Sequence, residues 1–450
     1  MSPDPQAKRK ASDAPISPPP LKRTIQSGTT KNAVANFFKP ASQKPKERTA
    51  WSERSDNPDR AATLLIGRYE PENSEKKPSK RHKIAAFDLD STLIATSSGK
   101  KHASAATDWR WWHASVPGKL KELYDEGYQV VILSNQGGMT LHFDANHKGP
   151  KTTKRVPEFK QKCSAVLNHL DIPITLYAAT GKDIYRKPRT GMWQEMLKDY
   201  GLETSDINLG ESFFVGDAGG RTSVYSSGSV IAKDFSCSDR NLAHNVGIDY
   251  KTPEEYFLGE TPRKFVRDFD LEQYPFEEDA LEHVFERKNK QDVVLSCGPP
   301  GAGKSTFYWN CLKPLGYERV NQDTLKSRDK CLKFAKEALD EGKSIAIDNT
   351  NADQDTRKIW IDLANKHNVP IRCVWFTTPI HLCEHNDAAR SLNKSLNPED
   401  REVLPKMAFT GFQSRYKAPQ LKEGFQDITE VDFKFRGSKE EYSLWGRYWL

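Results

Sequence analysis

The chain has 450 residues, 36% of them hydrophobic and 10% aromatic, so it can form the cores of two or three domains of ordinary size. Its 68 lysines and arginines outnumber its 61 acidic residues, but a net charge of +7 over this length favours acidic partners only weakly. No apolar run approaches the roughly 20 residues of a membrane span, and no signal-peptide core follows Met1, so we expect a soluble, intracellular protein.

The cysteines indicate a reducing compartment. They are odd in number and form no C-x-x-C pair, and they stand at Cys163, Cys237, Cys297, Cys311, Cys331, Cys373 and Cys383. Most of them lie in apolar or helical-looking runs. We therefore expect neither a disulfide framework nor a zinc site.

The first segment, residues 1–48, is rich in Pro, Ser, Lys and Ala and has little apolar periodicity, which predicts a disordered basic tail. Two basic clusters, Lys8–Lys10 and the pair Lys22 and Arg23, are spaced like a bipartite nuclear-import signal. Solvated basic residues without such a role are the alternative. We favour import and expect a nuclear protein.

A second feature of the tail is KNAVANFFKP, in which Val34, Phe37 and Phe38 stand at i, i+3 and i+4. This spacing resembles the short helical peptide that docks on a replication sliding clamp, although Lys31 stands where such peptides usually carry Gln. A loose contact of the aromatic pair with the protein's own surface explains the pattern equally well. A sliding clamp is therefore one of two interpretations.

After the tail, apolar runs that end in polar residues alternate with helical stretches. The expected strands of a first half, residues 49–262, lie at 83–90, 128–136, 175–180 and 212–218, with helices at 116–127 and 156–170. A second half, residues 263–450, repeats the scheme with strands at 292–298, 344–351 and 371–378. This alternation predicts two α/β units, each a doubly wound and mostly parallel sheet with its site at the carboxyl ends of the strands.

A four-part pattern of polar residues, three parts of it at strand ends, carries the chemistry of the first half. In FDLDSTL, Asp88 and Asp90 stand two apart, and a hydroxyl (Ser134), a lysine before a helix (Lys187) and a later acid (Asp217) follow in order. A carboxylate becomes an effective nucleophile toward a phosphate monoester when Mg²⁺ and cations neutralise the repulsion between the anions. The ordered set resembles that of haloacid-dehalogenase-type phosphotransferases, whereas a lone D-x-D would be an acidic loop.

The chemistry assigns each of these residues a role. Asp88 is the expected nucleophile that forms an aspartyl-phosphate, and Asp90 protonates the leaving alkoxide and then activates water. Ser134 and Lys187 hold the phosphoryl oxygens.

Mg²⁺ is the expected metal of this site. Its ligands would be the Asp88 carboxylate, the Asp90 backbone carbonyl and Asp217. The positions directly after Asp217 offer no second acid, so Asp234 is named as a substitute.

The second half contains GPPGAGKS, which matches G-x-x-x-x-G-K-[ST] completely between an expected strand and helix. Glycines let backbone N–H groups approach the phosphates of ATP, Lys304 reaches the β and γ oxygens, and Ser305 ligates Mg²⁺. The expected nucleotide-binding set is Gly298, Gly301, Gly303, Lys304, Ser305 and Thr306. A P-loop alone does not separate a kinase from an ATP-driven machine.

Acids and an arginine downstream favour a kinase. Asp323 follows an expected strand, where small P-loop kinases position a base for the acceptor hydroxyl. Asp348 ends the next strand and could serve Mg²⁺ or the acceptor. Either acid could instead only cap a helix, but we favour Asp323 as the base. Arg390 in HLCEHNDAAR could be a lid cation on the transferring phosphate, or an ordinary surface arginine.

Taken together, the motifs FDLDSTL, VILSNQGG, YRKPRTGMW, FFVGDAGGR, DFSCSDRNLA, GPPGAGKST, VNQDT, IDNTN and LKEGFQDI resemble those of the eukaryotic bifunctional polynucleotide kinase 3′-phosphatases. The similarity covers roughly residues 50–450 and has the phosphatase before the kinase. It implies an enzyme that hydrolyses 3′-phosphates at DNA ends and phosphorylates 5′-hydroxyl ends from ATP. A break repaired in this way would be ready for ligation.

The chain departs from the family pattern at several places. Ser91 replaces a common Gly, Ser134 replaces the usual Thr, and HNDAAR has fewer arginines than the usual lid segment. The tail is too short and polar for the forkhead-associated domain of animal members, so recruitment through phosphothreonine scaffolds is not expected. We expect a monomer.

Three other functions remain open from the residues alone. An RNA-end healing enzyme would use the same two chemistries, because neither motif set recognises the 2′-hydroxyl. A scaffold with inactive sites could bind DNA ends through its basic surface, although every catalytic position holds a competent side chain. A metabolic kinase–phosphatase of small sugars is the third alternative.

Overall fold

The computed structural model describes residues 47–450 apart from 73–80, 143–154, 227–228, 268–269 and 278–284. The basic clusters Lys8–Lys10 and Lys22–Arg23, and the residues Val34, Phe37 and Phe38, lie outside the described residues. Among the residues that are described, no helix has both the length and the apolar character needed to cross a membrane.

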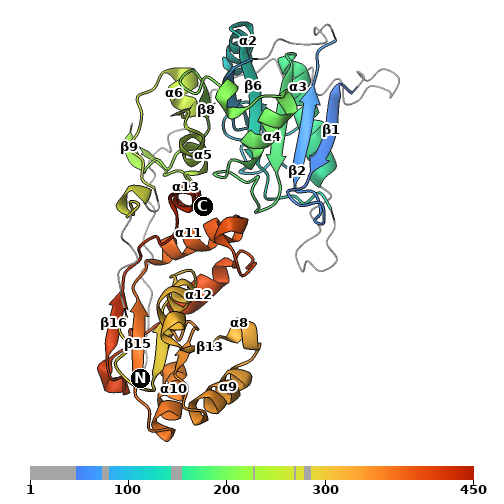
Figure 1. Ribbon diagram of the computed structural model, residues 1–450. Coiled ribbons are helices and arrows are strands. Elements are labelled where there is room, and N and C mark those ends of the chain that lie inside the picture. The colour runs from blue at the N-terminus through green and yellow to red at the C-terminus, as the bar shows by residue number, and fades with distance from the viewer. Residues whose placement is uncertain (1–46, 73–80, 143–154, 227–228, 268–269, 278–284) are drawn as a thin grey trace, which may run out of the picture. The chain divides into compact units, whose positions relative to one another are not determined.

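The first half is built on a seven-stranded sheet in the order β1-β2-β7-β6-β3-β8-β11 (Figure 1). Its strands are β1 (Thr49–Arg54), β2 (Leu64–Tyr69), β3 (Lys83–Phe87), β6 (Tyr128–Asn135), β7 (Ile174–Ala179), β8 (Phe213–Val215) and β11 (Asp249–Lys251). The five strands from β7 to β11 pair in parallel, whereas β1 and β2 pair antiparallel at one edge. Short hairpins join β4 (Ile94–Ala95) to β5 (Arg110–Trp111) and β9 (Val224–Ser226) to β10 (Ser229–Ile231).

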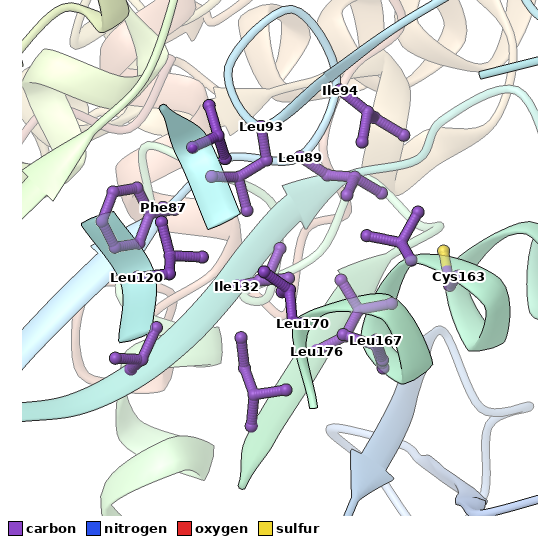
Figure 2. Packing of buried hydrophobic residues seen from close by; sticks show 14 of the residues in the cluster. Phe87, Leu89, Leu93, Ile94, Leu120, Ile132, Cys163, Leu167, Leu170 and Leu176 are labelled. Atoms are coloured by element: carbon purple, nitrogen blue, oxygen red, sulfur yellow. The ribbon is translucent and has the colours of Figure 1, made fainter. Parts of the chain in front are cut away.

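Helices cover both faces of this sheet because its central strands are apolar on both sides, as is usual in parallel sheets. One face packs against α2 (Val116–Asp125) and α3 (Arg155–Leu170), and the other against α4 (Gly191–Tyr200) and α5 (Ser238–Val246). Figure 2 shows the first of these cores, with Leu120 of α2 and Leu167 of α3 near Ile132 of β6. The remaining helices are η2 (Thr204–Asp206) and α6 (Pro253–Leu258).

The second half has a five-stranded parallel sheet in the order β13-β14-β12-β15-β16. Its strands are β12 (Val293–Cys297), β13 (Glu318–Val320), β14 (Ile345–Ile347), β15 (Ile371–Phe376) and β16 (Ile428–Val431). Its helices are η3 (Leu271–Gln273), α7 (Lys304–Phe307), η4 (Tyr308–Leu312), η5 (Lys313–Leu315), α8 (Gln322–Leu325), α9 (Arg328–Asp340), α10 (Gln354–Lys366), α11 (Ile380–Ser391), η6 (Lys394–Leu396), α12 (Lys406–Arg415), η7 (Leu421–Glu423) and α13 (Lys439–Trp445).

Helices α9 and α10 pack on one face of the second sheet, while α7, η4 and α12 pack on the other. The predicted fold class, two doubly wound α/β units, is therefore confirmed. Residues around the expected boundary follow the first half: Thr222 N donates to Lys264 O at 3.0 Å, and Val266 N donates to Gly220 O at 2.9 Å. The division at 262/263 stays a prediction.

Candidate active sites

The carboxyl end of β3 presents Asp88 to the first site. Its backbone N–H donates to the carbonyl of Val215 at 2.9 Å, which ties the turn after β3 to the end of β8. Leu89 and Leu93 anchor the same turn in the core. Ser91 has φ +60°, a left-handed backbone that glycine adopts at the lowest cost. This backbone conformation explains why glycine is common at this position. Ser91 adopts the same conformation at a cost in conformational free energy.

Lys187 is the central cation of the first site. Its Nζ lies 2.7 Å from Asp88 Oδ1 and 2.8 Å from Asp239 Oδ1, and all three side chains are buried. Burial opposes the charge on the lysine, but Asp239 and Asp88 outweigh it and raise the pKa of Lys187. Lys187 therefore stays protonated at the place where a phosphoryl group would meet the nucleophile.

The site has a second acid that the sequence reading missed. One carboxylate oxygen from each of Asp88, Asp217 and Asp239 lies within 4.8 Å of the others. A side chain on Gly216 would collide with Asp239, because a Cβ there would lie 2.2 Å from Oδ2. The glycine next to Asp217 therefore allows Asp239 to reach the site.

Asp234 was named from the sequence as the second acid of this site, and the geometry assigns that place to Asp239 instead. Its carboxylate pairs with Arg221 at 2.9 Å and accepts the backbone N–H groups of Gly219 and Arg221. It shapes the loop that follows Asp217. The motif DFSCSDR contains both acids, but only Asp239, at the start of α5, meets the Asp217 carboxylate.

These three carboxylates fit a divalent cation. Burial, reinforced by neighbouring acids, raises the pKa of Asp217 to about 8; burial raises the pKa of Asp88 to about 6 even though Lys187 opposes the shift. Oxygen ligands from crowded carboxylates are the donors that Mg²⁺ prefers, and a cation among them would relieve their repulsion.

Asp90 and Ser134 are linked through the amide of Gln136. Gln136 Nε2 donates to Asp90 Oδ2 at 2.7 Å and to Ser134 Oγ at 3.0 Å. Lys162 of α3 lies 3.2 Å from Asp90 Oδ1. Asp90 is half exposed, whereas Ser134 is buried at the end of β6. Gln136 lies within the quoted motif VILSNQGG but was given no role there, and Lys162 stands in no recognised motif.

The second site surrounds the loop between β12 and α7. Gly301 and Gly303 have φ +76° and +92°, and a Cβ on Gly301 would lie 2.3 Å from the Cys383 carbonyl oxygen. Lys304 is buried and its Nζ donates to the carbonyls of Gly298 and Pro299 at 3.1 and 2.6 Å. Ser305 and Thr306 follow in the first turn of α7. The loop has the backbone that a phosphate cradle requires.

Ser305 and Asp348 are joined at the carboxyl end of the sheet. Ser305 Oγ donates a hydrogen bond to Asp348 Oδ2 at 2.9 Å, and the same oxygen accepts a hydrogen bond from Arg319 Nε at 2.8 Å. Asn321, at the end of β13, donates to the Asp348 carbonyl at 2.6 Å. This network fixes the neighbouring strand ends, and Arg319 is a member that the sequence did not reveal.

Asp323 lies in α8, directly after β13, and its side chain is largely exposed. Gln322, the residue before Asp323, lines a mostly polar cavity of about 240 Å³ together with Arg328, Asn349, Thr350, Thr356 and Arg415. Two arginines in that lining suit an anionic ligand.

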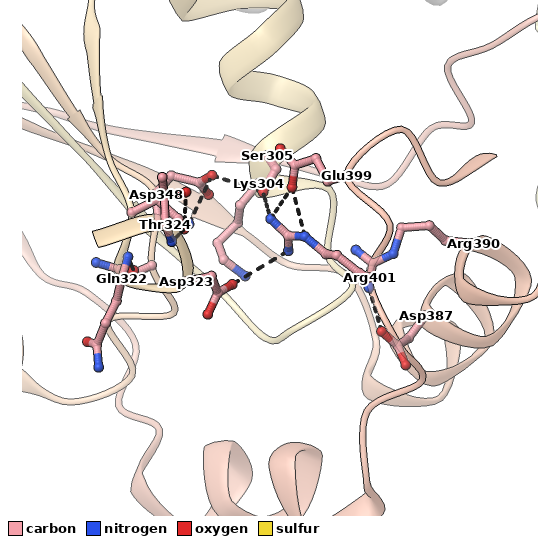
Figure 3. Close-up of polar contacts among 12 residues, drawn as sticks. Lys304, Ser305, Gln322, Asp323, Thr324, Asp348, Asp387, Arg390, Glu399 and Arg401 are labelled. Carbon is pink, nitrogen blue, oxygen red and sulfur yellow. Dashed lines mark hydrogen bonds and ion pairs between the residues drawn. The ribbon is translucent and has the colours of Figure 1, made fainter. Parts of the chain in front are cut away.

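Two arginines approach the second site from outside the sheet. Arg401 Nη2 lies 3.3 Å from Ser305 Oγ, and its Nη1 lies 3.9 Å from Asp323 Oδ2 (Figure 3). Arg390, the arginine chosen from sequence, instead pairs with Asp387 at 2.6 Å. Arg401 lies in a segment without a known motif, so no sequence signal pointed to it.

The chain resembles known proteins in both halves. Residues 83–257 match the family model described as polynucleotide kinase 3 phosphatase, and residues 293–419 match the AAA domain model. A bifunctional polynucleotide phosphatase/kinase of Schizosaccharomyces pombe is 39% identical over 390 residues, 86% of each chain.

Two further relatives match part of the chain. A polynucleotide 3′-phosphatase of Arabidopsis thaliana is 33% identical over 186 residues, which are 39% of this chain and 24% of that one. A polynucleotide 3′-phosphatase of Saccharomyces cerevisiae is 26% identical over an alignment of 225 positions that covers 39% of this chain and 87% of that one.

Proposed function

Because the chain belongs to the family of bifunctional polynucleotide phosphatase/kinases, we propose that it removes 3′-phosphates and phosphorylates 5′-hydroxyls at DNA ends. The observation that supports this proposal is that one chain holds two separate clusters of residues suited to phosphate chemistry, one around Asp88 and Lys187 and the other around Lys304 and Ser305.

In the first site, Asp88 attacks the phosphorus of the terminal phosphate. The 3′-oxygen leaves with a proton from Asp90, and an aspartyl-phosphate forms. Lys187, already 2.7 Å from Asp88, holds a phosphoryl oxygen and offsets its charge. Asp90 then takes a proton from the water that cleaves the aspartyl-phosphate, which returns Asp88 as a carboxylate.

Asp88, Asp217 and Asp239 would hold Mg²⁺ in that site, together with the Asp90 backbone carbonyl predicted from the sequence. The ion would neutralise the repulsion between the phosphate and the attacking carboxylate. Gln136 hydrogen-bonds both Asp90 and Ser134. The Ser134 hydroxyl would donate a hydrogen bond to a phosphoryl oxygen.

In the second site, the loop glycines and Lys304 hold the phosphates of ATP, while Ser305 and Asp348 stand where Mg²⁺ would bind. Asp323 accepts the proton of the 5′-hydroxyl as its oxygen attacks the γ-phosphorus, and ADP leaves. The cavity next to Asp323, with Arg328 and Arg415 in its lining, would receive the terminal nucleotide.

An exposed aromatic next to the first site favours a polynucleotide over a small sugar phosphate. The ring of Phe235 is 94% exposed and has Lys101 Nζ 5.3 Å from its centre. Its neighbour Asp234 binds the loop that follows Asp217. An aromatic face beside a cation suits a stacked base and its phosphate.

The expected partners outside the sites are DNA ends and, through Val34, Phe37 and Phe38, a sliding clamp. A nuclear location agrees with DNA-end processing and with the basic clusters of the tail. The bases for these proposals are the family and the sequence pattern, because the tail lies outside the described residues.

The test uses the full chain in single-turnover assays on matched DNA and RNA with 3′-phosphate or 5′-hydroxyl ends, with free sugar phosphates as a third substrate. We expect Asp88→Asn to abolish 3′-phosphatase activity and leave the kinase nearly intact, and Lys304→Ala to do the reverse. Loss of both activities from either change, in folded protein, would contradict two separate sites. A preference for RNA or sugars would contradict the DNA assignment.

A further inference from the structure

The second site contains a guanidinium that lies between the nucleotide-binding and the acceptor-activating residues. The two Nη atoms of Arg401 face Ser305 Oγ at 3.3 Å and Asp323 Oδ2 at 3.9 Å (Figure 3). Ser305 belongs to the phosphate loop, and Asp323 stands where the acceptor hydroxyl would bind. A phosphoryl group that passes from ATP to the acceptor must cross the space between these two side chains.

Arg401 is held in this position from several sides. Asn397 hydrogen-bonds both of its backbone groups, at 2.8 and 2.9 Å. Arg401 Nε donates to Glu399 Oε2 at 2.8 Å, while Glu399 Oε1 accepts from Arg319 at 2.8 Å and Trp309 at 3.0 Å. Arg319 in turn binds Asp348. The segment 397–401 is thus anchored to β13, which precedes Asp323, and to η4, which follows the helix of Ser305.

The charge state of the anchor supports this arrangement. Burial opposes ionisation of Glu399, but the Trp309 hydrogen bond and the charges of Arg401 and Arg319 lower its pKa to about 2. Glu399 is therefore a carboxylate at neutral pH. Its Oε2 pairs with Nε and Nη2 of Arg401, which orients the guanidinium and leaves Nη1 on the side of Asp323.

Arg390 has a different environment. Its Nη2 donates to Asp387 at 2.6 Å, and Asp387, which is almost fully buried, also accepts the backbone N–H of Leu404 at 2.8 Å. Leu404 stands three residues after Arg401. The Asp387–Arg390 pair thus fixes the far end of the segment that carries Arg401, which is a positioning task.

We propose that Arg401 contacts the transferring phosphoryl group in the kinase reaction and that Arg390 only positions the segment of Arg401. The inference rests on the proposed kinase function and names one residue within it. As ATP donates its γ-phosphoryl group, the bond to the β-phosphate oxygen breaks and the bond to the 5′-oxygen forms. The planar guanidinium offers two N–H groups to the phosphoryl oxygens, whose charge it stabilises most strongly during transfer.

The test compares Arg401→Ala, Arg401→Lys and Arg390→Ala in the full chain. We expect Arg401→Ala to lower the single-turnover rate of 5′-phosphorylation by about 100- to 1,000-fold, since loss of one such donor typically costs this much. Its affinity for ADP should stay within about twofold, because the contact forms during transfer. Arg401→Lys should recover part of the rate, and Arg390→Ala should lose less than Arg401→Ala.

A second readout is independent of turnover. In the presence of a 5′-hydroxyl oligonucleotide, ADP with aluminium fluoride should bind the unmodified chain much more tightly than ADP alone, because the fluoride complex mimics the transferring group. Arg401→Ala should lose most of that gain. The 3′-phosphatase rate and ADP binding of each variant show that both halves are folded.

Three results would overturn the inference. One is a kinase rate for Arg401→Ala within threefold of the unmodified chain, and another is a larger loss from Arg390→Ala. The third is an equal loss of affinity for ADP and for ADP with aluminium fluoride, which would make Arg401 a nucleotide-binding residue. If Lys304→Ala left the kinase rate unchanged, that result would instead contradict the proposed kinase function itself.

Discussion

Lys187 and Asp239, 52 residues apart in the chain, form a fully buried ion pair with 2.8 Å between Nζ and Oδ1. Asp239 also accepts the backbone N–H of Ala218 at 3.1 Å, next to Asp217. One carboxylate therefore orients Lys187, the proposed phosphate-binding lysine, and supports the strand end that carries Asp217, a proposed metal ligand.

The first prediction is that Asp239→Asn lowers 3′-phosphatase activity by at least 100-fold and raises the Mg²⁺ concentration needed for half-maximal rate. The change removes one charge from the three-carboxylate cluster and one partner from Lys187. Initial rates over a Mg²⁺ titration measure both effects. Asp234→Asn is the matched control, since Asp234 pairs with Arg221, and an equal shift in Mg²⁺ dependence for both variants would contradict the choice of Asp239.

The second prediction concerns Asp323. Asp323→Asn should lower the kinase rate at saturating substrate while ATP affinity stays unchanged, because Lys304 and Ser305 hold the nucleotide. Equilibrium binding of ATP and single-turnover transfer separate the two effects. An unchanged turnover rate would remove Asp323 from the mechanism.

The third prediction is that Asn245→Ala slows the phosphatase without changing the residues that contact phosphate. Asn245 Nδ2 donates to the Pro188 carbonyl at 2.9 Å and to the Tyr448 carbonyl at 2.7 Å. Pro188 follows Lys187, and Arg189 Nε donates to the Trp449 carbonyl at 3.1 Å. The segment 448–449 thus supports the loop that positions the catalytic lysine.

We expect a loss of about 5- to 20-fold for Asn245→Ala, comparable to the 1–2 kcal/mol of one or two buried hydrogen bonds. Asn245→Asp, which keeps the acceptor for Tyr448 N but loses the donor, should give a similar loss. The kinase rate is the internal control. Phosphatase rates that match the unmodified chain in both variants would show that the loop holds Lys187 without this support.

The fourth prediction concerns the tail. Deletion of residues 1–46 should leave both activities on short oligonucleotides close to those of the full chain, because the residues of the two proposed sites lie between 88 and 415. Nuclear accumulation should fall, since the basic clusters at Lys8–Lys10 and Lys22–Arg23 are removed. Cell fractionation or imaging measures this outcome, and unchanged accumulation would reject the import signal.

The fifth prediction tests the aromatic pair. The double change Phe37→Ala and Phe38→Ala should weaken binding of a 25–45 peptide to a purified sliding clamp by about 2–4 kcal/mol, the typical cost of two lost anchors. Nuclear import should survive, because the basic clusters remain. Equal or undetectable binding of the two peptides means that the pair has another use.

Local sequence determined the features that depend on a few consecutive residues. The loop from Gly298 to Ser305 needs glycines at positive φ and a lysine six residues after Gly298, and both requirements are visible in the printed chain. Asp88 is similar, because an apolar strand delivers the residue that follows it to the sheet's carboxyl edge. The fold class followed in the same way from the alternation of apolar and polar runs.

Tertiary structure alone decided which of several similar side chains reach each site. Asp234 and Asp239 are five residues apart in one motif, and only the packing of α5 against β8, with no side chain on Gly216, brings Asp239 to Asp217. Arg390 and Arg401 differ in the same way. Arg390 pairs with Asp387. Asn397 and Glu399 instead orient Arg401 toward Ser305. Such choices depend on contacts between residues far apart in the chain, which no local pattern of charge or hydrophobicity records.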